Sequence, residues 1–130
     1  MNSQTATVVV NAPKAQLYSY LADIENLPKW ATEFVQSLKQ VEGKYKVVTP
    51  MGELFTEMRA DEKTGVIDML MGPTESQMGA LPTRVVEISD DTSAFIFTLF
   101  QTPDLNDEMF EGQFASLNRE LANVKRHFEG

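Results

Sequence analysis

The sequence predicts an α+β fold in which a curved, seven-stranded antiparallel sheet holds one long C-terminal helix on its concave side. Three observations support this. A β-rich N-terminal segment leads into short helical segments, turn signals then recur along the middle of the chain, and one long amphipathic stretch closes it. Regular turn signals are typical of an antiparallel meander. Because a large sheet twists and curls, its concave side needs a long apolar element to fill it.

The first 30 residues predict a strand followed by two short helices. Residues 5–10 are rich in β-branched side chains, and Pro13 stands where a helix would begin. Apolar side chains then recur at helical spacing, at Leu17, Tyr20, Leu21 and Ile24. Pro28 interrupts this pattern just before Trp30, so we expect a proline-marked corner between the two helices.

The middle of the chain predicts six strands separated by turns rich in glycine, proline and aspartate. The expected strands cover residues 34–41, 44–50, 53–61, 65–71, 77–88 and 93–101. Residues 78–82 end in Pro82, which cannot donate a hydrogen bond to a neighbouring strand, so we expect a bend or bulge there.

The last segment, residues 106–128, predicts the long helix. Its apolar residues alternate in steps of four and three, at Phe110, Phe114, Leu117, Leu121, Val124 and Phe128. Acidic side chains lie in its first turns and Lys125, Arg126 and His127 in its last, an order that the helix dipole favours. At 1.5 Å per residue such a helix is roughly 34 Å long, enough to cross a small domain.

Composition excludes several classes of protein. The net charge of −8 and pI of about 4.6 disfavour nucleic acid as a partner, because phosphate backbones are repelled. No apolar run is long enough for stable membrane insertion. The N-terminus lacks the pattern of a secretory signal, so we expect a cytoplasmic location. We also expect residues 1–130 to form a single domain, since no linker, repeat or low-complexity tract divides them.

The motifs of cofactor chemistry are missing from the sequence. There is no cysteine, and His127 is the only histidine, so we expect no metal site of the usual kind. The glycines lie singly in turns and form neither a phosphate loop nor a dinucleotide fingerprint, so we expect no cofactor. Period-two alternation places Glu53 and Glu57 on the solvent side of their strand, which leaves the catalytic residues unknown.

Two stretches resemble a known superfamily. Residues 8–30, with the small residue and proline after the strand, the Ala22-Asp23 helix end and the Pro28-Lys29-Trp30 corner, resemble the opening of START-like proteins. Residues 114–125 are similar to the closing helix of that superfamily, which includes polyketide cyclase/dehydrases and lipid-transport proteins (SRPBCC). The resemblance implies a helix-grip fold with a cavity for hydrophobic or amphipathic molecules between sheet and long helix. It implies no particular reaction.

Candidate ligand-binding residues follow from this geometry. Methionine is abundant in the central strands, and its flexible, polarisable side chain suits adaptable apolar surfaces. The expected ligand-binding residues are Trp30, Phe34, Met58, Met69, Met71, Arg84, Phe97, Phe114 and Leu117. Arg84 has two interpretations: an exposed residue at a strand end, or a cation that faces the helix and pairs with a carboxylate or an anionic head group.

Three functional hypotheses remain open at this point. The first is binding of an apolar or amphipathic small molecule, such as a lipid or polyketide, in the cavity. The second is a cyclase/dehydrase-type enzyme that uses Arg84, Glu33 or Thr56 as acid, base or oxyanion donor. The third is an interaction module or homodimer. The expected strand 93–101 is apolar on both faces, so the side bearing Ile96 and Phe100 is covered by the N-terminal helices or another subunit, or forms an exposed patch.

Overall fold

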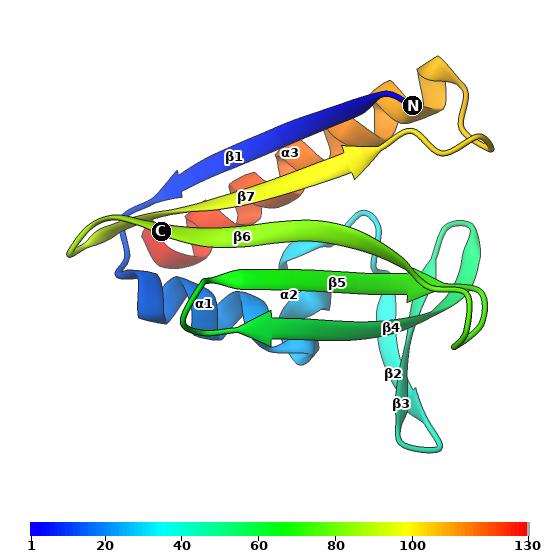
Figure 1. Ribbon diagram of the computed structural model, residues 1–130, viewed down its shortest axis with the longest axis horizontal. Helices are drawn as coiled ribbons and strands as arrows, with labels where there is room; N and C mark the ends of the chain where they lie inside the picture. The colour runs from blue at the N-terminus through cyan, green and yellow to red at the C-terminus, as the bar shows by residue number, and fades with distance from the viewer. Residues whose placement is uncertain (130) are drawn as a thin grey trace.

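The computed structural model describes residues 1–129 and shows the expected α+β arrangement (Figure 1). Its elements are β1 (Ser3–Val10), α1 (Lys14–Ala22), the 3₁₀ helix η1 (Ile24–Asn26), α2 (Leu27–Trp30), β2 (Ser37–Val41), β3 (Lys44–Thr49), β4 (Gly52–Asp61), β5 (Val66–Gly72), β6 (Gly79–Ser89), β7 (Thr92–Phe100) and α3 (Asp107–Glu129). The predicted order of a strand, short helices, six strands and a long helix is confirmed.

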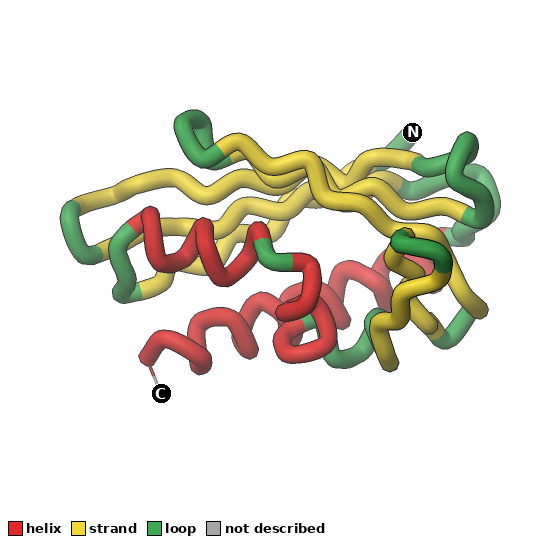
Figure 2. Tube along the Cα trace, turned by 90° about the horizontal axis from the view of Figure 1, so that it is seen from below, coloured by secondary structure: helices red, strands yellow, loops and turns green. Residues whose placement is uncertain are grey.

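The seven strands form one antiparallel sheet in the order β1-β7-β6-β5-β4-β3-β2. The meander from β2 to β7 keeps neighbouring strands adjacent, and β1 adds to its far side against β7. All helices lie on one face of the sheet, and the strands at one end curl toward them (Figure 2). The long helix α3 packs chiefly along β1. The predicted placement of this helix is confirmed.

The core lies between this face of the sheet and the helices. Alternate residues of the central strands point inward, with Ile67 and Met69 on β5, Val85 on β6 and Phe95 on β7. Leu17 and Leu21 of α1, Trp30 of α2, and Leu117, Leu121 and Val124 of α3 pack against them. The rings of Trp30 and Phe95 meet edge to face with centroids 5.7 Å apart.

The strand expected at 34–41 begins later than predicted, at Ser37. The backbone N–H groups of Glu33 and Phe34 both donate to the Glu120 side chain, at 3.0 Å each, and so are held in a turn. Backbone donors that are satisfied by a side chain need no partner strand. A contact from so distant a residue leaves no signal in the local pattern around Phe34.

The register excludes a bulge at Pro82, so that part of the expected bend or bulge at 78–82 is wrong, whereas β6 does curve over this stretch (Figure 1). Pro82 lies in regular register with Asp68 of β5, whereas the pairing of β6 with β7 begins only at Thr83. Val85 donates its N–H to Gly65 on the β5 side, so alternation turns the nitrogen of Pro82 toward β7, where β6 has no partner at this point, and the missing N–H costs no hydrogen bond. Before Thr83, β6 and β7 run apart (Figure 1). The register irregularity of this pair lies instead between Glu87 and Ser89.

The other face of the sheet is not covered by the N-terminal helices, so that alternative is wrong (Figure 2). Ile96 is half-buried on this face, whereas Phe100, at the end of β7, is 40% exposed and borders a cavity between the sheet and α3 that is described below. Self-association through this face stays a prediction. Among residues 1–129, no helix is long and apolar enough to cross a membrane.

Candidate functional site

A cavity of about 540 Å³ lies between the sheet and α3, and we call it the main cavity. Its sheet wall consists of Met69, Met71, Leu81, Phe97 and Leu99. Its helix wall consists of Met109, Gly112, Gln113, Ser116, Leu117 and Glu120 of α3. Residues of α2 and the turn after it close one end, at Leu27, Trp30, Ala31, Glu33, Phe34 and Val35. The mouth is bordered by Pro50, Met51, Phe100, Thr102, Asp104 and Leu105.

The place of the cavity follows from the local structure of the strands. Leu81 lies on the stretch of β6 that pairs only with β5, and Leu99 lies on the stretch of β7 that pairs only with β1. Their side chains therefore border a region where the two strands no longer hold each other close. The main cavity forms beneath this divergence because α3 alone does not fill it.

Most of the predicted ligand-binding residues border the main cavity: Trp30, Phe34, Met69, Met71, Phe97 and Leu117. They come from α2, the turn after it, β5, β7 and α3. Phe114 does not border the cavity and packs, half-buried, against the core. Met58 contributes to a different cavity, described below.

Arg84 lies outside the main cavity, which corrects its place in the predicted ligand site. Its neighbours Thr83 and Val85 are buried on the inner face of β6, so the alternation of the strand turns Arg84 to the other face. The side chain is exposed, and its Nε donates to the carbonyl of Thr64 at 3.2 Å. The interpretation as an exposed arginine is therefore correct.

Glu120 is the functional candidate that the sequence analysis missed. Its side chain is only 4% exposed, and its Oε2 accepts the two backbone N–H groups of Glu33 and Phe34. Burial raises the pKa of this carboxyl group, and the hydrogen bonds from Phe34 and Glu33 oppose that shift. One sequence signal could have indicated that Glu120 is buried: it stands beside Leu121 and three residues after Leu117, on the edge of the apolar stripe of the helix.

Glu33 lies at the border of the main cavity in a solvent-exposed, bidentate ion pair. Arg119 donates to its two carboxylate oxygens at 2.6 and 2.7 Å, and Ser116 donates to one of them at 3.0 Å. The hydrogen bond from Arg119 is the main reason that the pKa of Glu33 is lowered. This pairing keeps Glu33 ionised near neutral pH, which does not suit a general acid.

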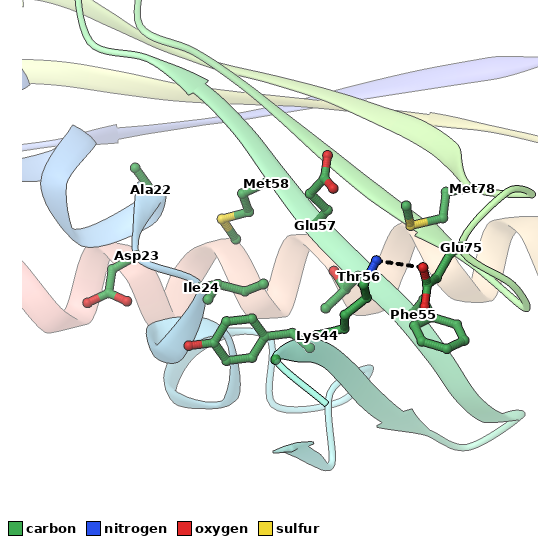
Figure 3. Close-up of a pocket in the computed structure, with 12 residues that line it drawn as sticks. Ala22, Asp23, Ile24, Lys44, Phe55, Thr56, Glu57, Met58, Glu75 and Met78 are labelled. Carbon is green, nitrogen blue, oxygen red and sulfur yellow. Dashed lines mark hydrogen bonds and ion pairs between the residues drawn. The ribbon is translucent and has the colours of Figure 1, made fainter. Parts of the chain in front are cut away.

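A second cavity of about 610 Å³ lies between η1, the start of β3 and β4, and residues from both faces of β4 border it (Figure 3). Ile24, Phe55, Met58 and Met78 supply apolar surface, and four exposed charged residues border it: Asp23, Lys44, Glu57 and Glu75. The Lys44 and Glu75 side chains form an ion pair of 2.6 Å at its edge.

Thr56 belongs to this second cavity and not to the main one. It is buried on the inner face of β4, as the alternation of that strand predicts, and its hydroxyl has no hydrogen-bond partner among the described residues. Glu53 and Glu57 are exposed on the opposite face of β4, also as predicted. The three residues of the enzyme hypothesis, Arg84, Glu33 and Thr56, therefore do not meet in one site.

Comparison with known proteins identifies the fold. No family model matches the chain, and no curated protein matches it. Among solved structures, a START superfamily protein from Mycobacterium smegmatis is similar with a TM-score of 0.73 and 13% identity, over 98% of this chain and 97% of the other. The Zhui aromatase/cyclase from Streptomyces sp. R1128 follows with a TM-score of 0.72 and 17% identity, over 98% and 93% of the two chains.

The protein has a START-like fold. A third structure with this START-like arrangement is the Aha1 dimer from Colwellia psychrerythraea, with a TM-score of 0.72 and 15% identity over 99% of this chain and 97% of the other. The match over nearly the full length confirms the resemblance of the opening and closing segments. At identities this low, the structural match establishes the fold alone, and the activity has to be argued from the site.

The main cavity of this START-like fold is bordered by both apolar and polar side chains. Its sheet wall is entirely apolar, while its polar groups lie on the helix wall, at the closed end and at the mouth. Among residues 1–129, no group of three His, Cys, Asp or Glu side chains could hold a metal ion. His127 is exposed near the end of α3, where its ring stacks on Tyr20 with centroids 4.1 Å apart.

Proposed function

We propose that this START-like protein binds an apolar or amphipathic small molecule in the main cavity. The observation that supports this best is the cavity itself, which lies between the sheet and α3 and is bordered by the apolar side chains of three strands. Its volume of about 540 Å³ is within the range of about 300–1,000 Å³ that is usual for ligand sites.

The mouth of the cavity supports the same proposal. Met51 and Phe100 border it and are 63% and 40% exposed, and Met109 on the helix wall is 46% exposed, so three of the large exposed apolar residues of the described chain border this cavity. Exposed apolar side chains that lie together at one opening are typical of a site that binds another apolar surface. Flexible methionines let that opening adapt to its ligand.

Desolvation provides the driving force of binding. Each Å² of apolar surface removed from water contributes about 25 cal/mol, so a ligand that buries about 250 Å² gains roughly 6 kcal/mol before the cost of its lost freedom. The similar solved structures include one named as a START superfamily protein and others named as aromatase/cyclases, and these names are consistent with a cavity that holds an apolar molecule. We favour binding over a cyclase/dehydrase activity, because the candidate catalytic residues lie apart.

Gly112 offers a direct test of the proposal. It borders the main cavity from α3, and an added Cβ atom would meet nothing within 4 Å. Gly112→Leu is expected to occupy the cavity without a clash and to lower the affinity for the neutral apolar dye Nile red at least tenfold. Helix propensity should meanwhile stabilise the variant by up to about 1 kcal/mol. A fluorescence titration of purified protein measures the affinity.

Gly112→Ala is the matched control, because it gains the same helix propensity and adds only one methyl group. Its dye affinity should stay close to that of the wild type. Met58→Trp serves as the control for the second cavity, which Met58 borders. If Gly112→Leu folds and binds the dye as the wild type does, the proposal is wrong. Loss of binding in Met58→Trp alone would place the dye in the second cavity.

A further inference from the structure

The two walls of the main cavity differ in chemistry. The sheet wall presents only methionine, leucine and phenylalanine side chains. The helix wall presents Gln113, Ser116 and Glu120, spaced three and four residues apart so that they share one face of α3. A ligand in this cavity therefore meets an apolar surface on one side and a row of polar groups on the other.

Several polar groups at this cavity have hydrogen-bonding capacity to spare. Among residues 1–129, Glu120 uses Oε2 for two backbone donors, while its Oε1 receives no hydrogen bond. The amide of Gln113 likewise makes no hydrogen bond within this part of the chain. The indole N–H of Trp30 is buried and has no partner there either. Of these three groups, the Trp30 indole N–H is the one that is fully buried, and a buried polar group without a partner is costly, so a ligand that accepts from it gains affinity. Glu120 Oε1 and the Gln113 amide are not fully buried, but both have hydrogen-bonding capacity left for a ligand.

The charges that border the main cavity are all acidic. They belong to Glu33, Asp104 and Glu120, and no lysine, arginine or histidine is among the described residues that border it. Arg119 pairs with Glu33 from outside the cavity, and among residues 1–129 no cation forms an ion pair with Glu120, although the charge of Arg119 acts on it from a distance. A carboxylate or phosphate head group near Glu120 would be desolvated and repelled at the same time.

We infer that the ligand is an amphiphile whose head group donates hydrogen bonds and carries no negative charge, and that this head group lies against Glu120. The inference rests on the proposed function and narrows it. The apolar part of the ligand lies on Met69, Met71 and Leu81, and a hydroxyl or similar donor reaches the carboxylate of Glu120. Neutral hydroxylated amphiphiles fit this site, whereas free fatty acids do not.

A matched pair of compounds tests the inference: decan-1-ol and decanoate at pH 8, each competing with Nile red. The wild type is expected to bind decanol at least tenfold more tightly than decanoate. Decanol is also the more apolar compound, so the decisive quantity is how the ratio of the two affinities changes in Glu120→Gln. The glutamine oxygen can still accept from Glu33 and Phe34, while its NH₂ group becomes a donor for the ligand. The preference for decanol should fall at least fivefold.

Glu111→Gln is the control, since it removes the same charge from an exposed position of α3 that does not border the cavity. It should leave the ratio of affinities unchanged. Decanoate bound as tightly as decanol by the wild type, or an unchanged ratio in Glu120→Gln, would overturn the inference and leave the proposed function standing. If neither compound displaces Nile red, the proposed function fails and the inference fails with it.

Discussion

Replacing Trp30 with alanine is expected to lower the free energy of unfolding by about 4 kcal/mol, as for other large buried aromatic residues. Trp30 is 2% exposed, packs edge to face on Phe95, and has its carbonyl oxygen hydrogen-bonded to the Asn123 side chain at 3.0 Å. The substitution removes the side chain that joins α2 to the sheet. Urea denaturation followed by circular dichroism measures the change.

Met51→Ala serves as the comparison, because Met51 is 63% exposed at the mouth of the main cavity. Substitutions at such positions usually change stability by no more than about 0.5 kcal/mol. Trp30→Phe should fall between the two, since a phenyl ring keeps part of the contact with Phe95. A loss below about 1 kcal/mol in Trp30→Ala would mean that α2 does not anchor to the core as described.

Replacing Glu120 with alanine is expected to cost about 3 kcal/mol, for a different reason. The backbone N–H groups of Glu33 and Phe34 would both lose their acceptor in a partly buried turn. A donor left unsatisfied by such a change costs about 1–3 kcal/mol. Glu120→Gln retains an acceptor and should recover most of the lost stability, which chemical denaturation of the three proteins can compare.

The contrast between these two variants separates hydrogen bonding from packing. If alanine and glutamine at position 120 were equally destabilising, the turn after α2 would not depend on the two backbone hydrogen bonds. Because burial raises the pKa of Glu120, the comparison is best made at one pH well above the usual range of a carboxyl group.

Hydrophobic periodicity and turn signals predicted the order of the helices and strands. The apolar stripe from Phe110 to Phe128 placed the long helix at 106–128, and the structure has it at Asp107–Glu129. Turn signals placed the strands to within a few residues, because a change of period from 3.6 to 2 is a local property of the sequence. The inner faces of β4 and β5 followed from the same alternation.

Contacts between distant segments were beyond the reach of these patterns. Nothing near Phe34 indicates that Glu120, on the last helix, will hold its N–H group and delay the strand. Nothing near Pro82 indicates that β6 will lack β7 as a partner there, so a bend or bulge was expected where β6 and β7 instead run apart. Arg84 stayed ambiguous because alternation defines two faces of a strand but does not say which of them meets α3.

The same limit explains what was missed in the candidate site. Apolar residues of the main cavity are recognisable, since they belong to the stripes that predict helix and strands. In the sequence, Gln113 and Ser116 look like ordinary polar residues beside the apolar stripe of a helix. Only the structure shows that they face the sheet wall across the main cavity. Their role depends on how far α3 stands from the strands, which is a property of the packed molecule.

The central claim is that a ligand occupies the main cavity, and Trp30, the only tryptophan, borders that cavity. Its fluorescence should therefore be quenched by a decanol that carries bromine on its chain. The account predicts saturable quenching in the wild type and in Gly112→Ala, and little in Gly112→Leu. Quenching that never saturates, or that is equal in all three proteins, would contradict the claim.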